Sequence, residues 1–422
     1  MFLGQVSWLD IVVFLFFLAP QLIIHVGFIQ TASCGLQALP FLCIRYSHPK
    51  IHYKHYTNDC AVINLPLSFV RERFLTPHEQ RSPFVQQASW FEDVVIRCVR
   101  YAFAYIPANI GRVFFSKDVA LPFFKFRMLR HGYSESPIHW NEVNQDDVKG
   151  IWIIADKTKE PDIVIYYAHG GGFAMGSSYF YLEFLLAWLN LLKESRKFRN
   201  PAIFALEHSL VPDESYPTQL HETFAGYKYV LSMTDDPSKI CVSGDSAGAT
   251  LILSLLLHIA RPNTANSDPS IERVHTETPA MAVLISPWTT LESPQHKNTS
   301  SDYLDANSLH LYAHQYAGSR ASVFDPSISP GACKDLDWWR MASPTRGFFI
   351  TYGSEEVFAP ETRDLIMLLK KSGKVEIRGQ EQTGGIHAWP VAALFLSSTS
   401  AARRKGLRML VSEIGERMGK AH

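Results

Sequence analysis

The chain has 422 residues, of which 47% are hydrophobic, and its 40 Lys and Arg balance its 40 Asp and Glu for a formal net charge of +0. A chain of this length and apolar content can bury a sizeable core, so we expect one large domain and a smaller unit. The balanced charge, with basic residues spread along the chain, argues against nucleic acid as a partner.

The first 44 residues include a long uncharged stretch. No Lys, Arg, Asp or Glu occurs between residues 11 and 44, and Ile11 to Ile29 is long enough to cross a hydrocarbon core as a helix. We therefore expect residues 1–44 to form a single-pass membrane anchor. The alternatives are a cleaved signal peptide, which lacks the usual basic start here, and a buried N-terminal helix.

The side of the membrane stays open. Arg45, Lys50 and Lys54 follow the apolar stretch, which favours a cytosolic position for the rest of the chain. Asn298 begins the sequence Asn-Thr-Ser, a possible glycosylation site that would favour the lumen.

Residues 45–145 mix aromatic and basic residues and predict a linker and part of a cap, with a helix over 91–104. From residue 151 strand-like and helix-like stretches alternate. This alternation predicts a mostly parallel central sheet with helices on both faces, over residues 146–422. The helices are expected at 180–192, 219–231, 250–259 and 361–369.

The sequence Gly244-Asp245-Ser246-Ala247-Gly248 follows a short apolar run and precedes a long one. Glycines on both sides of a serine let a strand turn sharply into a helix and expose the hydroxyl at the bend. We therefore expect Ser246 to be a nucleophile.

A second glycine-rich segment, His169-Gly170-Gly171-Gly172-Phe173, closes the apolar run at 163–168. Residues without side chains leave backbone N–H groups open toward a developing oxyanion. The N–H groups of Gly171, Gly172 and Ala247 are therefore the candidate oxyanion hole.

The acid and the base of such a site should follow later in the chain, the acid first. His387, in a loop after a short strand, is the candidate base. Glu355 is the candidate acid because it stands nearest the end of the strand at 348–350, with Glu356 and Asp364 as alternatives.

These motifs, together with Ser286-Pro287-Trp288, resemble those of the hormone-sensitive-lipase-type esterases, from about residue 152 to 389. The resemblance implies an α/β-hydrolase fold with a helical cap, and a triad of Ser246, Glu355 and His387. Such esterases usually carry an aspartate where Glu355 stands. The chain is also similar to the fungal membrane-anchored steryl acetyl hydrolases, which implies the endoplasmic reticulum.

We therefore expect a serine hydrolase that removes a short acyl group from a bulky apolar alcohol, through an acyl-enzyme on Ser246. An insert over 291–343, rich in Tyr and Trp, is expected to belong to the cap. Two alternatives remain: an acyltransferase or cyclisation catalyst of secondary metabolism with the same triad, and a non-catalytic ligand-binding protein on the same fold.

No cofactor is expected. The six cysteines show no C-x-x-C spacing, which favours free thiols over a disulfide framework. A metal site could be imagined at His52, His55, Asp59 and Cys60, but no second group of ligands supports it and serine chemistry needs no metal. The oligomeric state is left open.

Overall fold

The computed structural model describes residues 2–38, 67–145, 147–261, 277–373 and 375–419. Two features of the sequence lie outside these residues. They are the basic residues Arg45, Lys50 and Lys54, and the group His52, His55, Asp59 and Cys60.

The core of the molecule is an eight-stranded sheet in the order β1-β2-β4-β3-β5-β6-β7-β8. The neighbouring strands β4, β3, β5, β6, β7 and β8 are parallel, whereas β2 runs antiparallel to both of its neighbours, β1 and β4. This arrangement confirms the predicted mostly parallel α/β fold. The strands are β1 His139–Gln145, β2 Val148–Ile154, β3 Ile163–Ala168, β4 Pro201–Leu206, β5 Ile240–Asp245, β6 Met281–Ile285, β7 Phe348–Gly353 and β8 Ile377–Gln382.

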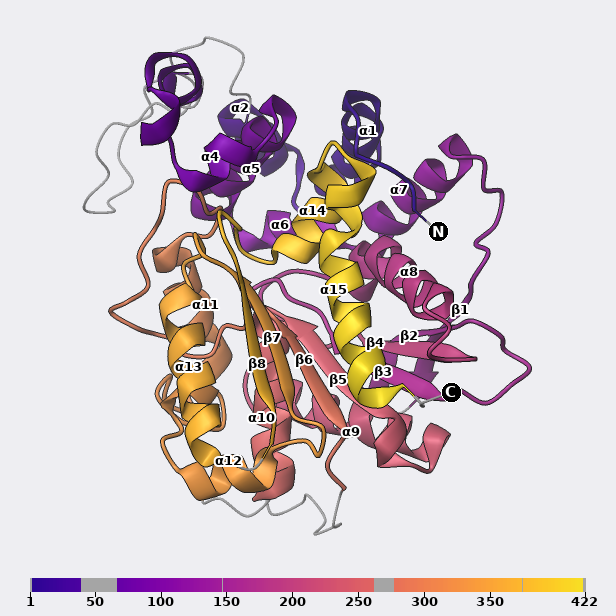
Figure 1. The fold of residues 1–422 in the computed structure, drawn as a ribbon. Coiled ribbons are helices and arrows are strands. Elements are labelled where there is room, and N and C mark those ends of the chain that lie inside the picture. Colours follow the sequence, from indigo (N-terminus) through magenta and orange to yellow (C-terminus); the bar gives the residue numbers. More distant parts are fainter. Residues whose placement is uncertain (1, 39–66, 146, 262–276, 374, 420–422) are drawn as a thin grey trace.

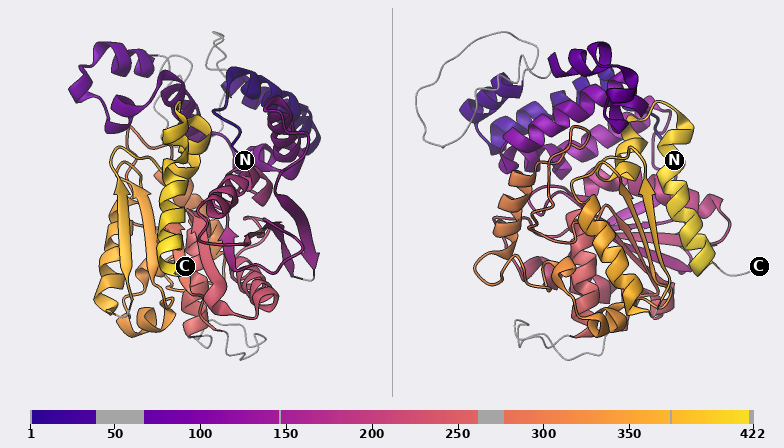
Figure 2. Two further views of the ribbon diagram at one scale, coloured as in Figure 1. Left: turned by 45° about the vertical axis from the view of Figure 1, so that its right-hand side comes forward. Right: turned by 60° about the vertical axis from the view of Figure 1, so that its left-hand side comes forward.

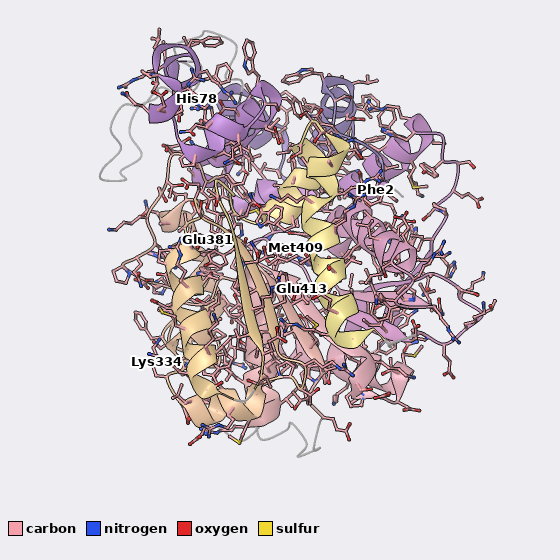
Figure 3. All side chains as sticks on the ribbon, in the orientation of Figure 1. Phe2, His78, Lys334, Glu381, Met409 and Glu413 are labelled. Carbon is pink, nitrogen blue, oxygen red and sulfur yellow. The ribbon has the colours of Figure 1, made fainter. Side chains whose placement is uncertain are left out.

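Helices cover both faces of this sheet (Figure 1). Successive residues of a strand face opposite sides, so Tyr167 packs with α8, α14 and α15, while Tyr166 packs with α9, α10 and α13. Side chains fill both layers (Figure 3). The helices are α8 Ser178–Glu194, α9 Thr218–Thr234, α10 Ala247–Ala260, α13 Ala359–Ser372, α14 Trp389–Leu396 and α15 Ser400–Met418.

From residue 67 on, the segment predicted as linker and cap is mainly helical, and its last residues belong to the sheet as β1. Its helices lie across one end of the molecule (Figure 2), and α5 covers the predicted helix at 91–104. The guanidinium of Arg112, on α6, donates to the carbonyl of Ala174 (3.0 Å) and pairs with Asp213 (2.6 Å). The elements are η1 Arg71–Leu75, η2 His78–Gln80, α4 Pro83–Gln87, α5 Trp90–Tyr105, α6 Ala108–Phe115 and α7 Lys117–Arg130.

The insert over 291–343 contains α11 (Ala306–Ala317) and α12 (Leu336–Ala342). These two helices lie apart. One turn of α12 packs against α10, where the Trp338 indole donates to the Leu257 carbonyl (2.8 Å), whereas α11 contacts α5. Only part of the insert therefore belongs to the cap.

The first apolar stretch forms α1 (Trp8–His25), followed by α2 (Phe28–Ala38). Within the described residues, α1 is the one helix that is long and apolar enough to cross a membrane. The residues before α1 lie in the main core. Leu3 is 1% exposed there, and the Val6 N–H donates to the Phe395 carbonyl (2.9 Å).

A buried ion cluster holds this N-terminal segment in place. The fully buried guanidinium of Arg127 lies 3.0 Å from Asp10 and donates twice to Glu183, each time at 2.9 Å. It also donates to the carbonyl of Gly4 (2.9 Å). Leu3 and Asp10 are thus buried in the large domain, which ties the start of the chain to it.

We expect Arg127→Met to lower the free energy of unfolding by about 3–5 kcal/mol, because it leaves the buried carboxylates of Asp10 and Glu183 without their main partner. The matched control is Lys117→Met, which breaks the exposed pair with Glu142 and should cost no more than about 1 kcal/mol. Thermal unfolding of the full chain measures both. Equal losses would mean that the cluster does not hold the segment.

Candidate active site

Ser246 lies at the turn between β5 and α10, where the sequence predicts it. Its backbone has φ 52° and ψ −121°, a sparsely populated conformation for a residue with a side chain. A Cβ on Gly244 would lie 2.6 Å from the carbonyl carbon of Gly248, and a Cβ on Gly248 would overlap the Ala168 carbonyl. Glycine is therefore required on both sides of this turn.

The glycine-rich loop after β3 is fixed by the carboxylate of Asp245. One oxygen accepts from the Gly170 N–H (2.8 Å) and the Tyr167 hydroxyl (2.6 Å), and the other accepts from the Tyr181 hydroxyl (2.7 Å). Because Asp245 precedes Ser246, one residue sets the position of the loop relative to the serine.

Three backbone donors in this region are unused. Gly171 and Gly172 have φ of 120° and 63°, so the loop takes a path that favours glycine. Among the hydrogen bonds of the described residues, none has the N–H of Gly171, Gly172 or Ala247 as its donor. These are the three donors that the sequence identifies as the oxyanion hole.

His387 lies between β8 and α14 and is 3% exposed. Its Nδ1 is 3.7 Å from Oε2 of Glu356. The Ser286 hydroxyl donates to that same oxygen (2.6 Å), as does the Gly353 N–H (3.2 Å), and the hydroxyl oxygen accepts from the Ala388 N–H (2.9 Å).

The carboxylate beside the imidazole is therefore that of Glu356, and the expectation of Glu355 in this place does not fit the geometry. The Glu355 side chain is partly exposed and accepts from the hydroxyls of Ser354 and Ser301. Asp364, the other alternative, is exposed and accepts from Gln295. The turn after β7 directs the side chains of Glu355 and Glu356 to different sides. The distance of a residue from the end of the strand does not predict this direction.

Asp302 is a further residue of this site, and the sequence offers no signal for it. Its carboxylate is fully buried and accepts from the His387 N–H through one oxygen and from the Val357 N–H through the other, each at 2.9 Å. It thereby joins the loop that carries Glu356 to the loop that carries His387. Arg100, on α5, donates to its backbone carbonyl.

The elbow and the histidine loop meet at the end of β6. The Ser246 N–H donates to the Ile285 carbonyl (3.0 Å), and the next residue, Ser286, accepts from the Ala388 N–H. The strand register brings Asp245, Ile285 and Thr351 side by side at the same edge of the sheet. The structure thus brings the predicted serine and histidine segments together.

Burial sets the charge states of the site. It lowers the pKa of His387, although the carboxylates of Asp302 and Asp245 act in the opposite direction. It raises the pKa of Glu356 to about 8, against the hydrogen bonds from Ser286 and Gly353. A neutral imidazole is the form that accepts a proton, so His387 has the protonation state that a general base needs.

His169, at the start of the glycine-rich loop, packs against another histidine. Its ring stacks on that of His208 at 4.2 Å, and burial lowers the pKa of each imidazole to about 4. Both rings are therefore neutral and pack under the loop.

Two tyrosines of the insert border the site. The ring of Tyr303 lies 5.8 Å from that of His387, and a Cβ on Gly172 would meet the ring of Tyr312 at 3.0 Å. Tyr316 instead stacks on Phe173 at 3.9 Å and is buried. Only some of the aromatic side chains of the insert thus border the site.

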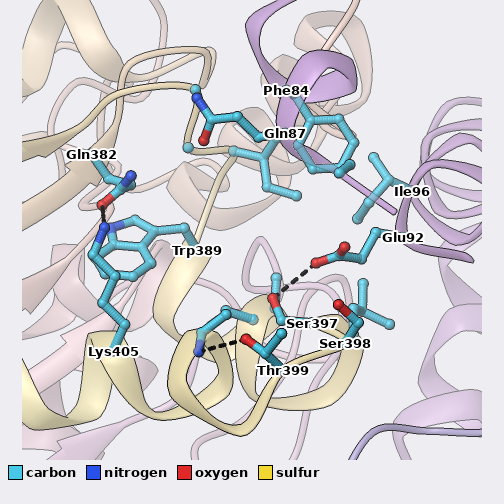
Figure 4. A pocket seen from close by; sticks show the side chains of 18 of the residues that line it. Phe84, Gln87, Glu92, Ile96, Gln382, Trp389, Ser397, Ser398, Thr399 and Lys405 are labelled. Carbon is cyan, nitrogen blue, oxygen red and sulfur yellow. Dashed lines mark hydrogen bonds between the residues drawn. The ribbon is translucent and has the colours of Figure 1, made fainter. Parts of the chain in front are cut away.

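A cavity of about 350 Å³ lies on the outer side of the histidine loop (Figure 4). Phe84 and Ile96 line it on one side and Trp389 on the other, and Gln382 accepts from Lys405 (2.8 Å) at its edge. Gly384 to Ile386 form part of its wall, but neither Ser246 nor His387 lines it. This cavity is therefore separate from the candidate oxyanion hole.

Two further expectations concern other sites. In the part of the chain that the structure describes, no group of three His, Cys, Asp or Glu residues could hold a metal ion. Asn298, the possible glycosylation site, precedes α11, where its amide donates to Asp305 (2.7 Å) and accepts from the Ala306 N–H (2.8 Å).

The sequence matches the alpha/beta hydrolase fold family over residues 165–391. A protein of Schizosaccharomyces pombe named as a steryl acetyl hydrolase is 27% identical over 59% of this chain and 67% of its own length. An acetyl-hydrolase of Streptomyces hygroscopicus is 26% identical over 53% of this chain and 67% of its own.

Solved structures show the same fold. An esterase of the bacterial hormone-sensitive lipase family aligns with a TM-score of 0.55 at 22% identity, over 76% of this chain and 99% of that one. Carboxyl esterase 2 from Tuber melanosporum aligns with a TM-score of 0.54 at 20% identity, over 68% and 90%.

The lowered pKa of His387 predicts the pH dependence of any reaction that uses it as a base. We expect the decline in kcat/KM that comes from protonation of His387 to lie below pH 6.5, whereas a loss that comes from protonation of Glu356 would occur near pH 8. Asp302→Asn removes a charge that favours the imidazolium, so the decline should move to still lower pH. Glu355→Gln is the matched control and should leave the profile unchanged. A shift to higher pH in Asp302→Asn would contradict this assignment.

Proposed function

This chain belongs to the α/β-hydrolase fold family, as an ester-hydrolysing serine hydrolase of the hormone-sensitive-lipase type, and we propose that it hydrolyses its ester through an acyl-enzyme on Ser246. The observation that carries this proposal is the set of N–H groups of Gly171, Gly172 and Ala247, which donate to no acceptor among the described residues, together with the strained turn at Ser246. Donors fixed before the reaction stabilise an oxyanion without reorganisation.

In this mechanism the Ser246 hydroxyl attacks the acyl carbon and gives its proton to His387. The carbonyl oxygen becomes an oxyanion that accepts from the three backbone N–H groups. The tetrahedral intermediate collapses, the alcohol leaves with the proton from His387, and the acyl group remains on Ser246. Water, activated by His387, then releases the acid.

We assign the acid of the triad to Glu356. Its Oε2 is held by Ser286 and Gly353 and faces Nδ1 of His387 at 3.7 Å. A carboxylate in this place orients the imidazole and stabilises the imidazolium that forms during attack. Ser286 acts as a positioning residue, because it touches both Glu356 and the backbone of the histidine loop.

We propose a short acyl group on a bulky apolar alcohol as the substrate. Tyr312, beside Gly172, and Tyr303, beside His387, give the site apolar walls next to the oxyanion donors. The names of two relatives, a steryl acetyl hydrolase and an acetyl-hydrolase, support an acetyl ester. The apolar helix α1 supports access to a molecule dissolved in lipid.

Ser246→Ala should lower ester turnover by several orders of magnitude and abolish labelling by a fluorophosphonate probe, because the nucleophile is absent. Ser243→Ala is the matched control. That serine lies three residues earlier in β5, is buried, and its hydroxyl has no partner. Labelling that persists in Ser246→Ala would refute the acyl-enzyme.

Glu356→Gln should lower kcat by ~10²–10⁴-fold, because a neutral amide neither stabilises the imidazolium nor fixes its tautomer. Glu355→Gln should stay within about threefold of the unchanged chain. The pair is matched in chemistry and differs only in which glutamate faces His387. The reverse order of the two losses would restore Glu355 as the acid.

A panel of acetyl, butyryl and long-chain esters on both small and sterol-sized alcohols tests the substrate class. We expect kcat/KM to be highest for acetyl esters of the large alcohols. A preference for long acyl chains would refute the short acyl group, and release of products only when an acceptor alcohol is added would indicate acyl transfer.

A further inference from the structure

Helix α1 has two apolar faces, and the described residues of the chain cover only one of them. On the inner face, the Phe14 ring lies 4.5 Å from that of Phe114 on α6 and 5.0 Å from that of Phe123 on α7. The outer side chains recur at helical spacing and are 47–73% exposed. They are Trp8, Leu9, Val12, Leu15, Phe16, Ile23 and Ile24.

The exposed apolar side chains continue beyond α1. Phe28 and Ile29 of α2 are 71% and 82% exposed. At the start of α1 the Trp8 ring meets that of Phe91 at 5.4 Å, and the neighbouring Trp90 meets Phe74 of η1 at 5.4 Å. We call the exposed apolar side chains of α1, α2, η1 and Trp90 the apolar face; these elements lie at one end of the molecule (Figure 2).

The chemistry of the apolar face fits lipid. Helices α1 and α2 contain a single charged residue, Asp10, and it is fully buried in the ion cluster with Arg127. His25 and Gln30 are exposed polar side chains of these helices. A mainly apolar surface of this kind is unfavourable in water and marks an interaction site. Tryptophans such as Trp8 and Trp90, 61% exposed, are the side chains enriched at the boundary between hydrocarbon and water.

A helix that crosses the bilayer does not fit the contacts of α1. The residues before it, such as Leu3, and the helices α4 and α5 that follow it in the chain pack on the same domain. The covered face of α1 contacts α6 and α7 along its length. Lys117, Lys125 and Arg130 of α7 would have to enter the hydrocarbon with it, at a cost of several kcal/mol.

We propose that the chain binds a single leaflet as a monotopic protein, with α1 lying along the membrane surface and the apolar face inserted among the lipids. The folded domain packs on the covered face of α1. The polar surface of this domain then faces water, in place of the polar face that an isolated interfacial helix must carry in its own sequence. This proposal replaces the single-pass arrangement expected from the sequence. It does not depend on the activity of Ser246.

Photo-crosslinking from two positions of α1 tests the proposal. The full chain carries p-benzoylphenylalanine in place of either Phe14, on the inner face, or Phe16, on the outer face, and is bound to phosphatidylcholine vesicles. We expect position 16 to crosslink to lipid and position 14 to crosslink to the segments with Phe114 and Phe123. Lipid attached at position 14 would show a bilayer-spanning helix, and protein from a second copy attached at position 16 would show a dimer interface. Either result overturns the proposal.

Vesicle binding gives a second measurement. The double variant Phe16→Glu, Ile24→Glu should lower the partition of the full chain into phosphatidylcholine vesicles at least tenfold, because two carboxylates would enter the interface. Met341→Glu is the control, since this exposed side chain lies on α12, at the opposite end of the molecule from α1 (Figure 1). Unchanged partition of the double variant, or an equal loss in the control, would refute the assignment of the apolar face.

Discussion

The close approach of β3, β5 and α10 beneath Ser246 is the constraint on which the candidate site depends. The carbonyl of Ala168 lies where a side chain on Gly248 would be, and Gly244 meets the same backbone from the other side. The serine therefore takes a strained conformation that a looser packing would release. The same contact places the loop after β3 beside the serine. The positions of the candidate oxyanion donors and of the nucleophile are therefore set by the same pair of strands.

Three buried carboxylates lie in the region of His387, and each of them accepts from backbone N–H groups. Asp245 accepts from the oxyanion loop, Asp302 from the histidine and acid loops, and Glu356 from the end of β7. Burial raises the pKa of all three, so these hydrogen bonds offset part of the cost of burying charge. The site is thus held together by polar contacts that a water-filled cleft would weaken.

The sequence predicts the fold and the central parts of the site because both follow from local patterns. Ser246 and the glycines around it are required by one sharp turn, and alternating apolar runs indicate the layers. Glu356 and Asp302 depend on how a turn points its side chains and on contacts between distant loops, for which the sequence carries no periodic signal. The contacts of α1 are unpredictable for a related reason: an apolar run shows that a helix avoids water, but it does not show whether protein or lipid covers each side.

The burial of Leu3 and Asp10 in the main domain makes the segment that leads into α1 part of the folding of that domain. Many membrane-bound enzymes carry their leader as an exchangeable module, which can be lost or replaced while the enzyme keeps its shape. Here a new leader would also have to supply the carboxylate for Arg127 and the side chain that fills the place of Leu3. A descendant of this protein could therefore exchange this segment only by rebuilding part of the interior of the domain.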